Sequence, residues 1–225
     1  MRLASLASVL ALTVVSGAAA ADPEGETPAG AAAQTGTYAF GVRVGGYGFR
    51  REGDTSSNNW NECRMNGLGV FGQRALRGPF FVEAGLDTYF SIGQGEPTDL
   101  PIDRENVLVS AAAGVRTSLT SWLHAYAQLG TGVELARLSV PYGGSTISDD
   151  KAMPEGFFGF GGDLRLAHGT YFGATIRVLV MGNFDYDPQR LQMSSSWVAP
   201  PPPSSVFAAS PDLATQAQFY LRRDL

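Results

Sequence analysis

The sequence PFFVEAGLDTYFSI, residues 79–92, alternates between two kinds of side chain. Phe80, Val82 and Leu86 fall on one face of an extended chain, and Glu83 and Asp87 fall on the other, because successive side chains of a strand point to opposite sides. Strands of soluble proteins are usually about 5–6 residues long, whereas a tilted strand needs roughly 9–11 residues to cross a bilayer core. The pattern therefore predicts one wall of a small β-barrel whose apolar face meets lipid.

The bulk composition excludes several classes of function. The chain has 225 residues and a net charge of −5, which argues against a nucleic-acid partner, because such a partner calls for a basic patch. Cys63 is the single cysteine, so disulfide frameworks and CxxC metal or redox sites are excluded. No zinc cluster or phosphate-binding glycine loop is visible. We expect neither a cofactor nor a metal ion.

The first residues have the pattern of a secretory signal peptide. Arg2 supplies positive charge, residues 6–15 form a short apolar run, and small residues precede Asp22. We expect a signal peptide over residues 1–21, cleaved near Ala20 or Ala21, and a flexible leader over residues 22–36. No later stretch has the ~20 apolar residues of a spanning helix. A membrane-spanning domain over residues 37–225 would therefore be built from strands.

The rest of the chain contains eight extended segments with the same two-faced alternation. Short turns at 74–79, 120–121 and 167–169 alternate with long links at about 51–63, 93–106, 137–155 and 182–212. Short periplasmic turns and long extracellular loops are typical of bacterial outer-membrane barrels. We predict an all-β fold, an eight-stranded antiparallel up-and-down transmembrane β-barrel. Its strands are expected at about 37–50, 64–75, 79–92, 107–119, 122–135, 156–166, 170–181 and 213–222.

The two faces of these segments differ in charge. The centre of the apolar face carries none, as expected if that face meets lipid, where charge costs about 2–4 kcal/mol at mid-depth. Balanced opposite charges on the other face suit a narrow interior. We predict that they form a salt-bridge network that plugs the lumen, with Glu83 and Arg116 as neighbours; a gated proton or ion path is the alternative. The predicted network is Arg43, Glu83, Asp87, Arg116, Glu134, Asp163, Arg165 and Arg177.

Aromatic residues gather near the ends of the segments, which is typical of interfacial girdles. One group is expected at the short-turn rim: Phe80, Phe81, Trp122, Tyr171, Phe172, Phe219 and Tyr220. The other group is expected toward the long links: Tyr89, Phe90, Tyr142, Phe157 and Phe158.

The signal peptide, the first strand GVRVGGYGF, the eight segments and the final TQAQFYLRRDL resemble the small eight-stranded outer-membrane β-barrel proteins of Gram-negative bacteria, the OmpA/OmpX-like superfamily. The resemblance covers about residues 37–225 and lies in pattern rather than in a diagnostic motif. It implies the outer membrane as location, with outer-membrane lipid, lipopolysaccharide and the barrel-insertion machinery as partners. Such proteins typically end in an aromatic residue, whereas this chain ends in Leu225.

The long links are the expected functional surface, since loops on a rigid scaffold commonly carry binding. The longest, 182–212, contains Phe184, Tyr186 and Trp197 next to a run of prolines, and these three residues are the candidate binding surface for an unidentified extracellular ligand. Some barrels of this size modify lipid A, but His124 and His168 are the only histidines and neither lies in a GxSxG motif.

We therefore predict a non-enzymatic outer-membrane barrel with a structural or surface-interaction role. One alternative is a secreted or periplasmic lipocalin-like barrel, whose apolar face would line an interior and bind an apolar ligand. A second is a narrow outer-membrane pore, although an eight-stranded barrel has room for side chains and not for a wide aqueous channel.

Overall fold

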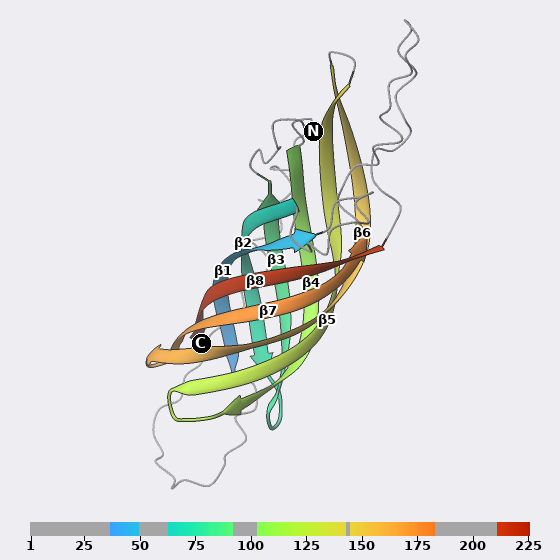
Figure 1. The fold of residues 1–225 in the computed structure, drawn as a ribbon. Coiled ribbons are helices and arrows are strands. Elements are labelled where there is room, and N and C mark those ends of the chain that lie inside the picture. The colour runs from blue at the N-terminus through green and yellow to red at the C-terminus, as the bar shows by residue number, and fades with distance from the viewer. Residues whose placement is uncertain (1–36, 50–62, 92–102, 143–144, 183–210) are drawn as a thin grey trace, which may run out of the picture. The chain divides into compact units, whose positions relative to one another are not determined.

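The computed structural model describes residues 37–49, 63–91, 103–142, 145–182 and 211–225. Eight antiparallel strands form a closed barrel in chain order (Figure 1), which confirms the predicted up-and-down barrel. The strands are β1 (Tyr38–Phe49), β2 (Cys63–Ala75), β3 (Phe80–Phe90), β4 (Asp103–Ser118), β5 (Leu123–Tyr142), β6 (Ser145–Ala167), β7 (Thr170–Gly182) and β8 (Pro211–Asp224).

Short connections join the strands at one end of the barrel. They are residues 76–79 between β2 and β3, 119–122 between β4 and β5, and 168–169 between β6 and β7. Gly78 and Gly169 have φ values of 72° and 70° there, a left-handed conformation that favours glycine. We call this the short-turn end and the opposite one the loop end. The residues between the other strand pairs, including the predicted binding loop at 182–212 with Phe184, Tyr186 and Trp197, lie almost entirely outside the described residues, as do residues 1–36.

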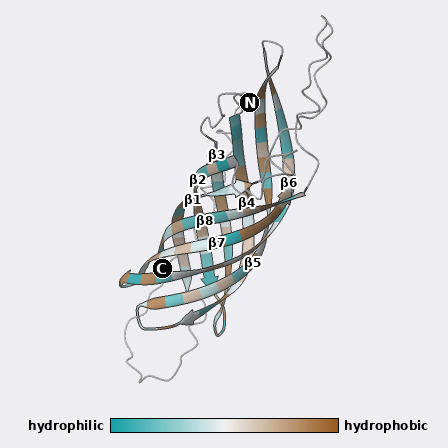
Figure 2. Ribbon diagram, in the orientation of Figure 1, coloured by the Kyte–Doolittle hydropathy of each residue, from teal (hydrophilic) through white to brown (hydrophobic). Residues whose placement is uncertain are grey.

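The outward face of the barrel is apolar, as the alternation predicted. Val44, Leu129 and Phe219 are 58%, 68% and 56% exposed at mid-strand positions, and Figure 2 shows hydrophobic and hydrophilic residues interleaved along the strands. On the described strands, the exposed charges begin only near the strand ends, with Arg74 and Arg223 at the short-turn end and Arg64 and Glu105 among those at the loop end. The apolar belt is thus bounded by charge on both sides.

The β5–β6 hairpin differs from the prediction, which placed a loop at residues 137–155. Both strands continue through this region, and they pair up to Tyr142 and Ser145. β4 pairs with β5 only as far as Ser139, and β7 pairs with β6 only from Gly156, so the hairpin extends beyond its neighbours (Figure 1). Inward alternation continues here, with Leu138 and Val140 completely buried, and this burial explains why the strands persist.

Two pairs of side chains join the strands of this hairpin. Arg137 donates from Nε and NH2 to the two carboxylate oxygens of Asp150, at 2.7 and 2.8 Å. The Ser139 and Ser148 hydroxyls lie 2.9 Å apart. The hydrogen bonds from Arg137 hold the pKa of the Asp150 carboxyl below its usual range. Such cross-strand pairs help to fix the register of the hairpin.

Buried side chains gather in two clusters in the interior. An apolar cluster fills it toward the loop end and includes Tyr47, Phe49, Met65, Leu108 and Met153. A second cluster of aromatic rings lies toward the short-turn end: Phe71, Phe81, Tyr126 and Tyr220. None of the described residues forms a helix long and apolar enough to cross a membrane.

The predicted aromatic girdles are only partly correct. Phe80, Trp122, Phe172, Phe219, Phe90 and Phe158 are exposed on the outer face. Their neighbours Phe81, Tyr89, Phe157, Tyr171 and Tyr220 are instead buried inside the barrel. Adjacent aromatic residues such as Phe80 and Phe81 cannot share a face of one strand, because the side-chain period is two. Five of the predicted girdle residues therefore line the interior.

Candidate functional site

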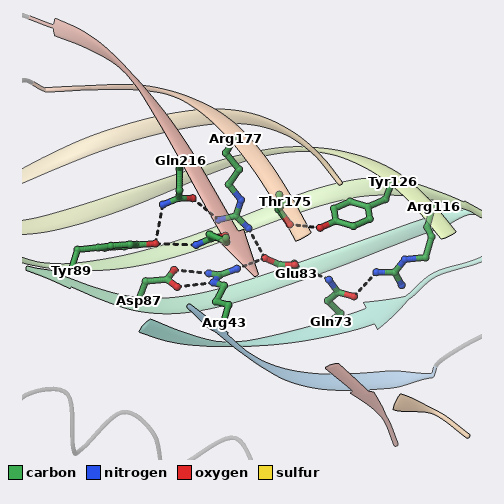
Figure 3. Close-up of polar contacts among 11 residues, drawn as sticks. Arg43, Gln73, Glu83, Asp87, Tyr89, Arg116, Tyr126, Thr175, Arg177 and Gln216 are labelled. Atoms are coloured by element: carbon green, nitrogen blue, oxygen red, sulfur yellow. Dashed lines mark hydrogen bonds and ion pairs between the residues drawn. The ribbon is translucent and has the colours of Figure 1, made fainter. Parts of the chain in front are cut away.

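Four charged side chains meet in the middle of the lumen and form the central cluster: Arg43, Glu83, Asp87 and Arg177 (Figure 3). Arg43 on β1 donates from Nε and NH2 to both carboxylate oxygens of Asp87, at 2.6 and 2.5 Å. Its NH1 donates to Glu83 at 2.8 Å, and Arg177 on β7 donates to the same Glu83 oxygen at 2.9 Å. All four side chains are at most 8% exposed. Two positive and two negative charges thus neutralise each other away from water.

Glutamine side chains extend the central cluster. Gln73 donates to Glu83 at 2.7 Å and accepts from Arg116 at 2.8 Å, so it connects Arg116 to the central cluster (Figure 3). With its amide oxygen turned toward Arg177, Gln128 accepts from the Nε and NH2 of that residue at 2.9 and 3.0 Å. Buried charges are tolerated when they are paired and hydrogen-bonded, and these amides supply the additional bonds.

Two glycines make room for the bidentate pair. A side-chain carbon at Gly69 would meet the Asp87 carboxylate, and one at Gly85 would meet the Arg43 guanidinium. The arginines also lie against aromatic faces: the Arg43 guanidinium carbon is 5.3 Å from the centre of the Phe71 ring. The Arg177 guanidinium carbon is 4.6 Å from the centre of the Phe157 ring. The central cluster is therefore enclosed by rings as well as by polar partners.

A second charged group surrounds Asp163 near the short-turn end. This carboxylate is completely buried, and it lies 2.8 Å from His124 Nδ1 and 3.2 Å from the Tyr220 hydroxyl. Arg222 and Arg116 approach the same carboxylate at 3.5 and 3.7 Å. One acid is thus shared among donors from three other strands.

The loop-end half of the lumen holds carboxyl groups in a different setting. Glu134 Oε1 accepts from the Tyr47 hydroxyl at 2.8 Å and also contacts the Asn106 amide. Tyr47 lies 3.2 Å from the sulfur of Met65 as well. One oxygen each of Glu134 and Glu155 is buried without a hydrogen-bond partner among the described residues. The carboxyl groups of the central cluster, by contrast, are paired with arginines.

Comparisons with known proteins bear on the fold. No protein-family model matches the chain, and no curated protein matches it. The crystal structure of Neisserial surface protein A is similar, with a TM-score of 0.53 over 84% of this chain and 97% of that one, at 13% sequence identity. This chain has the fold of a small outer-membrane barrel.

A further solved structure is similar at a lower score. It is Ail, the attachment invasion locus protein of Yersinia pestis, in complex with the heparin analogue sucrose octasulfate. Its TM-score is 0.48, with 13% identity over 85% of this chain and all of that one.

The barrel brings most of the predicted network residues inside but divides them into groups. Arg43, Glu83, Asp87 and Arg177 lie together, Arg116 and Asp163 lie near the short-turn end, and Glu134 lies toward the loop end. The expected contact of Glu83 with Arg116 is replaced by a bridge through Gln73. Arg165 is wrong as a lumen residue, because its side chain is exposed. It is still the cross-strand partner of Tyr171, which faces the interior, so it keeps the inward phase but lies at the short-turn rim, where its side chain is exposed.

Sequence reasoning missed several lumen residues. The uncharged partners Gln73, Gln128, Gln216 and Gln218 carry no charge signal, although they occupy inward positions of their strands. Arg222 also points inward and is 5% exposed, a position that the alternation of the last strand could have revealed. Glu155 was hidden by the expectation of a loop at 137–155.

The histidines offer no complete nucleophilic arrangement. His124 is held by Asp163, and Ser118 is its cross-strand partner on β4, but no hydrogen bond joins the Ser118 and His124 side chains. His168 lies in the exposed turn between β6 and β7. Among the described residues, no group of three His, Cys, Asp or Glu side chains could hold a metal ion.

Proposed function

We propose that this protein is a non-enzymatic outer-membrane barrel with a closed lumen, which presents its loop end at the cell surface for structural support or surface interaction. This proposal rests on which face of the strands points outward: large apolar side chains cover the outside of the barrel, and paired charges lie inside it. A lipocalin-like barrel would have the opposite arrangement, with an apolar interior around its ligand and a polar exterior.

The dimensions of the barrel support insertion in a bilayer. Its strands have 11 to 23 residues, enough for the roughly 9–11 residues that a tilted strand needs to cross the hydrocarbon core. Within the ring, closure pairs every strand on both edges, which the bilayer requires because it offers no water as a hydrogen-bond partner.

Refolding from urea tests the proposal directly. The mature chain is refolded with and without detergent micelles and compared on SDS gels before and after boiling. We expect a heat-dependent mobility shift only with detergent, because the apolar belt needs lipid-like surroundings. A soluble folded monomer without detergent would contradict the membrane assignment and favour the lipocalin-like alternative.

Cysteine labelling tests which end faces the outside. In a Cys63→Ser background, Ser148→Cys places a thiol on the β5–β6 hairpin, and Ser121→Cys places one in the short turn between β4 and β5. We expect a membrane-impermeant maleimide to label the hairpin cysteine in intact cells. The short-turn cysteine should react only after the outer membrane is permeabilised. The reverse pattern would contradict the proposed orientation.

The narrow-pore alternative is tested by conductance. The central cluster and the surrounding amides support a closed lumen, because they occupy its middle with bonded side chains. We expect the wild-type protein to show no steady conductance in planar bilayers, and Arg116→Ala to show none either. A steady wild-type conductance would favour the pore.

A further inference from the structure

The exposed charged side chains at the short-turn end are all arginines. In the described residues, the exposed Arg, Lys, Asp and Glu side chains at this end are Arg74, Arg77, Arg165 and Arg223. Asp224, half-buried at this end, is already paired with Arg222 at 2.9 Å. At the loop end, by contrast, exposed Arg64 is accompanied by exposed Asp103, Glu105 and Asp150. The short-turn rim therefore attracts anions, and the loop rim has mixed charge.

Two of these arginines flank the first strand. Arg223 on β8 pairs with Phe40, and Arg74 on β2 pairs with Tyr38, which is two residues away on the same outward face of β1. Neighbouring strands lie about 4.8 Å apart and two residues span about 6.8 Å along a strand, so the two arginine backbones are roughly 12 Å apart across β1. Two side chains of this length can reach one group placed between them.

The surroundings of these two arginines leave their charge available. In the described part of the chain, neither Arg74 nor Arg223 has an ion-pair partner. The Arg74 guanidinium carbon lies 5.4 Å from the centre of the Tyr38 ring, which orients it without neutralising it. Tyr38 and Phe40 are 53% and 50% exposed, so apolar rings and positive charge are presented side by side.

We propose that Arg74 and Arg223, with Tyr38 and Phe40, form a binding site for an anionic phospholipid of the leaflet at the short-turn end. The guanidinium groups bind the phosphate, and the rings contact the start of the acyl chains. A planar guanidinium matches phosphate geometry, and the boundary of an apolar belt is the depth at which a headgroup phosphate lies. The inference rests on the proposed membrane insertion.

A phospholipid fits this site better than a soluble anion. The ligand must satisfy positive charge on one side and exposed aromatic surface on the other, and a phospholipid supplies both in one molecule. Net negative charge distinguishes phosphatidylglycerol from zwitterionic phosphatidylcholine, although both contain a phosphate. The rim should therefore prefer phosphatidylglycerol.

Lipid retention measured by native mass spectrometry tests the site. Wild type, Arg74→Gln and Arg223→Gln are folded in a neutral detergent, scored by heat-dependent gel mobility, and mixed with equal amounts of phosphatidylglycerol and phosphatidylcholine. We expect wild type to retain phosphatidylglycerol preferentially and each variant to lose that preference by about fivefold. Arg74→Lys should keep most of it, because the charge remains.

Arg64→Gln is the matched control, because Arg64 is an exposed arginine at the opposite end of the same strand, β2. It should leave the preference unchanged. Equal retention of both lipids by wild type, an equal loss in Arg64→Gln, or complete displacement by soluble glycerol phosphate would overturn the inference. A chain that fails to fold in detergent contradicts the proposed function as well, whereas a folded chain without lipid preference contradicts the lipid site alone.

Discussion

Two arginine–aspartate pairs in this barrel share one geometry and have opposite surroundings. Arg43 and Asp87 make two parallel hydrogen bonds deep in the lumen, and Arg137 and Asp150 make the same two on the projecting hairpin. The side chain of Asp87 is 1% exposed, whereas that of Asp150 is 61% exposed. Water competes for the exposed pair and screens it, but it does not reach the buried pair. The same bonds should therefore have very different consequences for stability.

The largest expected effect is that of Asp87→Asn. It leaves the Arg43 guanidinium buried with half of its counter-charge, and breaking a buried pair in this way costs about 3–5 kcal/mol. The free energy of unfolding, measured by urea titration in micelles, should fall by that amount.

Asp150→Asn is the matched control for Asp87→Asn, because it removes the same group from the exposed pair. Its unfolding curve should overlay that of wild type. A loss at Asp150 as large as that at Asp87 would show that burial is not what separates the two pairs.

The next largest effect is expected for an arginine placed on the outer face of the barrel, in contrast to the paired arginines of the lumen. Leu129→Arg puts a guanidinium on the outer face, where it has no partner, and should cost about 2–4 kcal/mol at mid-depth. Leu166→Arg, near the short-turn end of β6, should cost much less. The free energy of unfolding of both variants is measured by the same urea titration. Equal losses would contradict the assignment of Leu129 to the middle of the apolar belt and of Leu166 to its edge.

A smaller effect is expected for Glu134→Gln in the loop-end half of the lumen. This carboxyl already has one buried oxygen without a partner, and glutamine keeps an acceptor for the Tyr47 hydroxyl while removing a charge. Stability should change by less than about 1 kcal/mol or increase. If Glu134→Gln were as destabilising as Asp87→Asn, the charge of Glu134 would matter as much for stability as that of Asp87, which is paired with an arginine.

The smallest effect concerns pH and the exposed pair. Because Arg137 lowers the pKa of Asp150, the pair contributes stability above the ordinary aspartate pKa, and that contribution is lost as pH falls through the lowered value. Carboxyl carbon shifts of Asp150, followed by NMR in micelles, should titrate at lower pH in wild type than in Arg137→Gln. Identical midpoints would contradict the lowered pKa.

The faces of the strands could be predicted from the sequence, but the contacts inside could not. Alternation alone placed Arg43, Glu83, Asp87 and Arg177 inside, since the period of two is a local property. Which of them meet depends on the register and tilt of the whole ring, and no local pattern contains that information. The expected Glu83–Arg116 contact failed for this reason, because Arg116 lies nearer the short-turn end and reaches Gln73 instead.

Other differences arose from residues whose usual preference was overridden. Pro141, Pro154 and the paired acids Asp149 and Asp150 favour a loop, yet the inward apolar positions of the hairpin keep the strands paired. Arg165 keeps the inward phase as the partner of buried Tyr171, but it lies at the short-turn rim, where its side chain is exposed. Glutamines such as Gln73 and Gln128 carry no charge, so they were not included in the predicted network, although alternation placed Gln128 on the inward face.

The pairing of β1 with β8 has a consequence for how the chain is made. Ala39 is the partner of Asp224, so the seam that closes the ring joins segments from opposite ends of the domain. Non-local pairings of this kind form slowly, because a long intervening chain must be ordered first. Until β8 arrives, β1 is an open edge that can pair with the wrong strand or another molecule. Protection of this edge therefore depends on the arrival of the last strand of the chain.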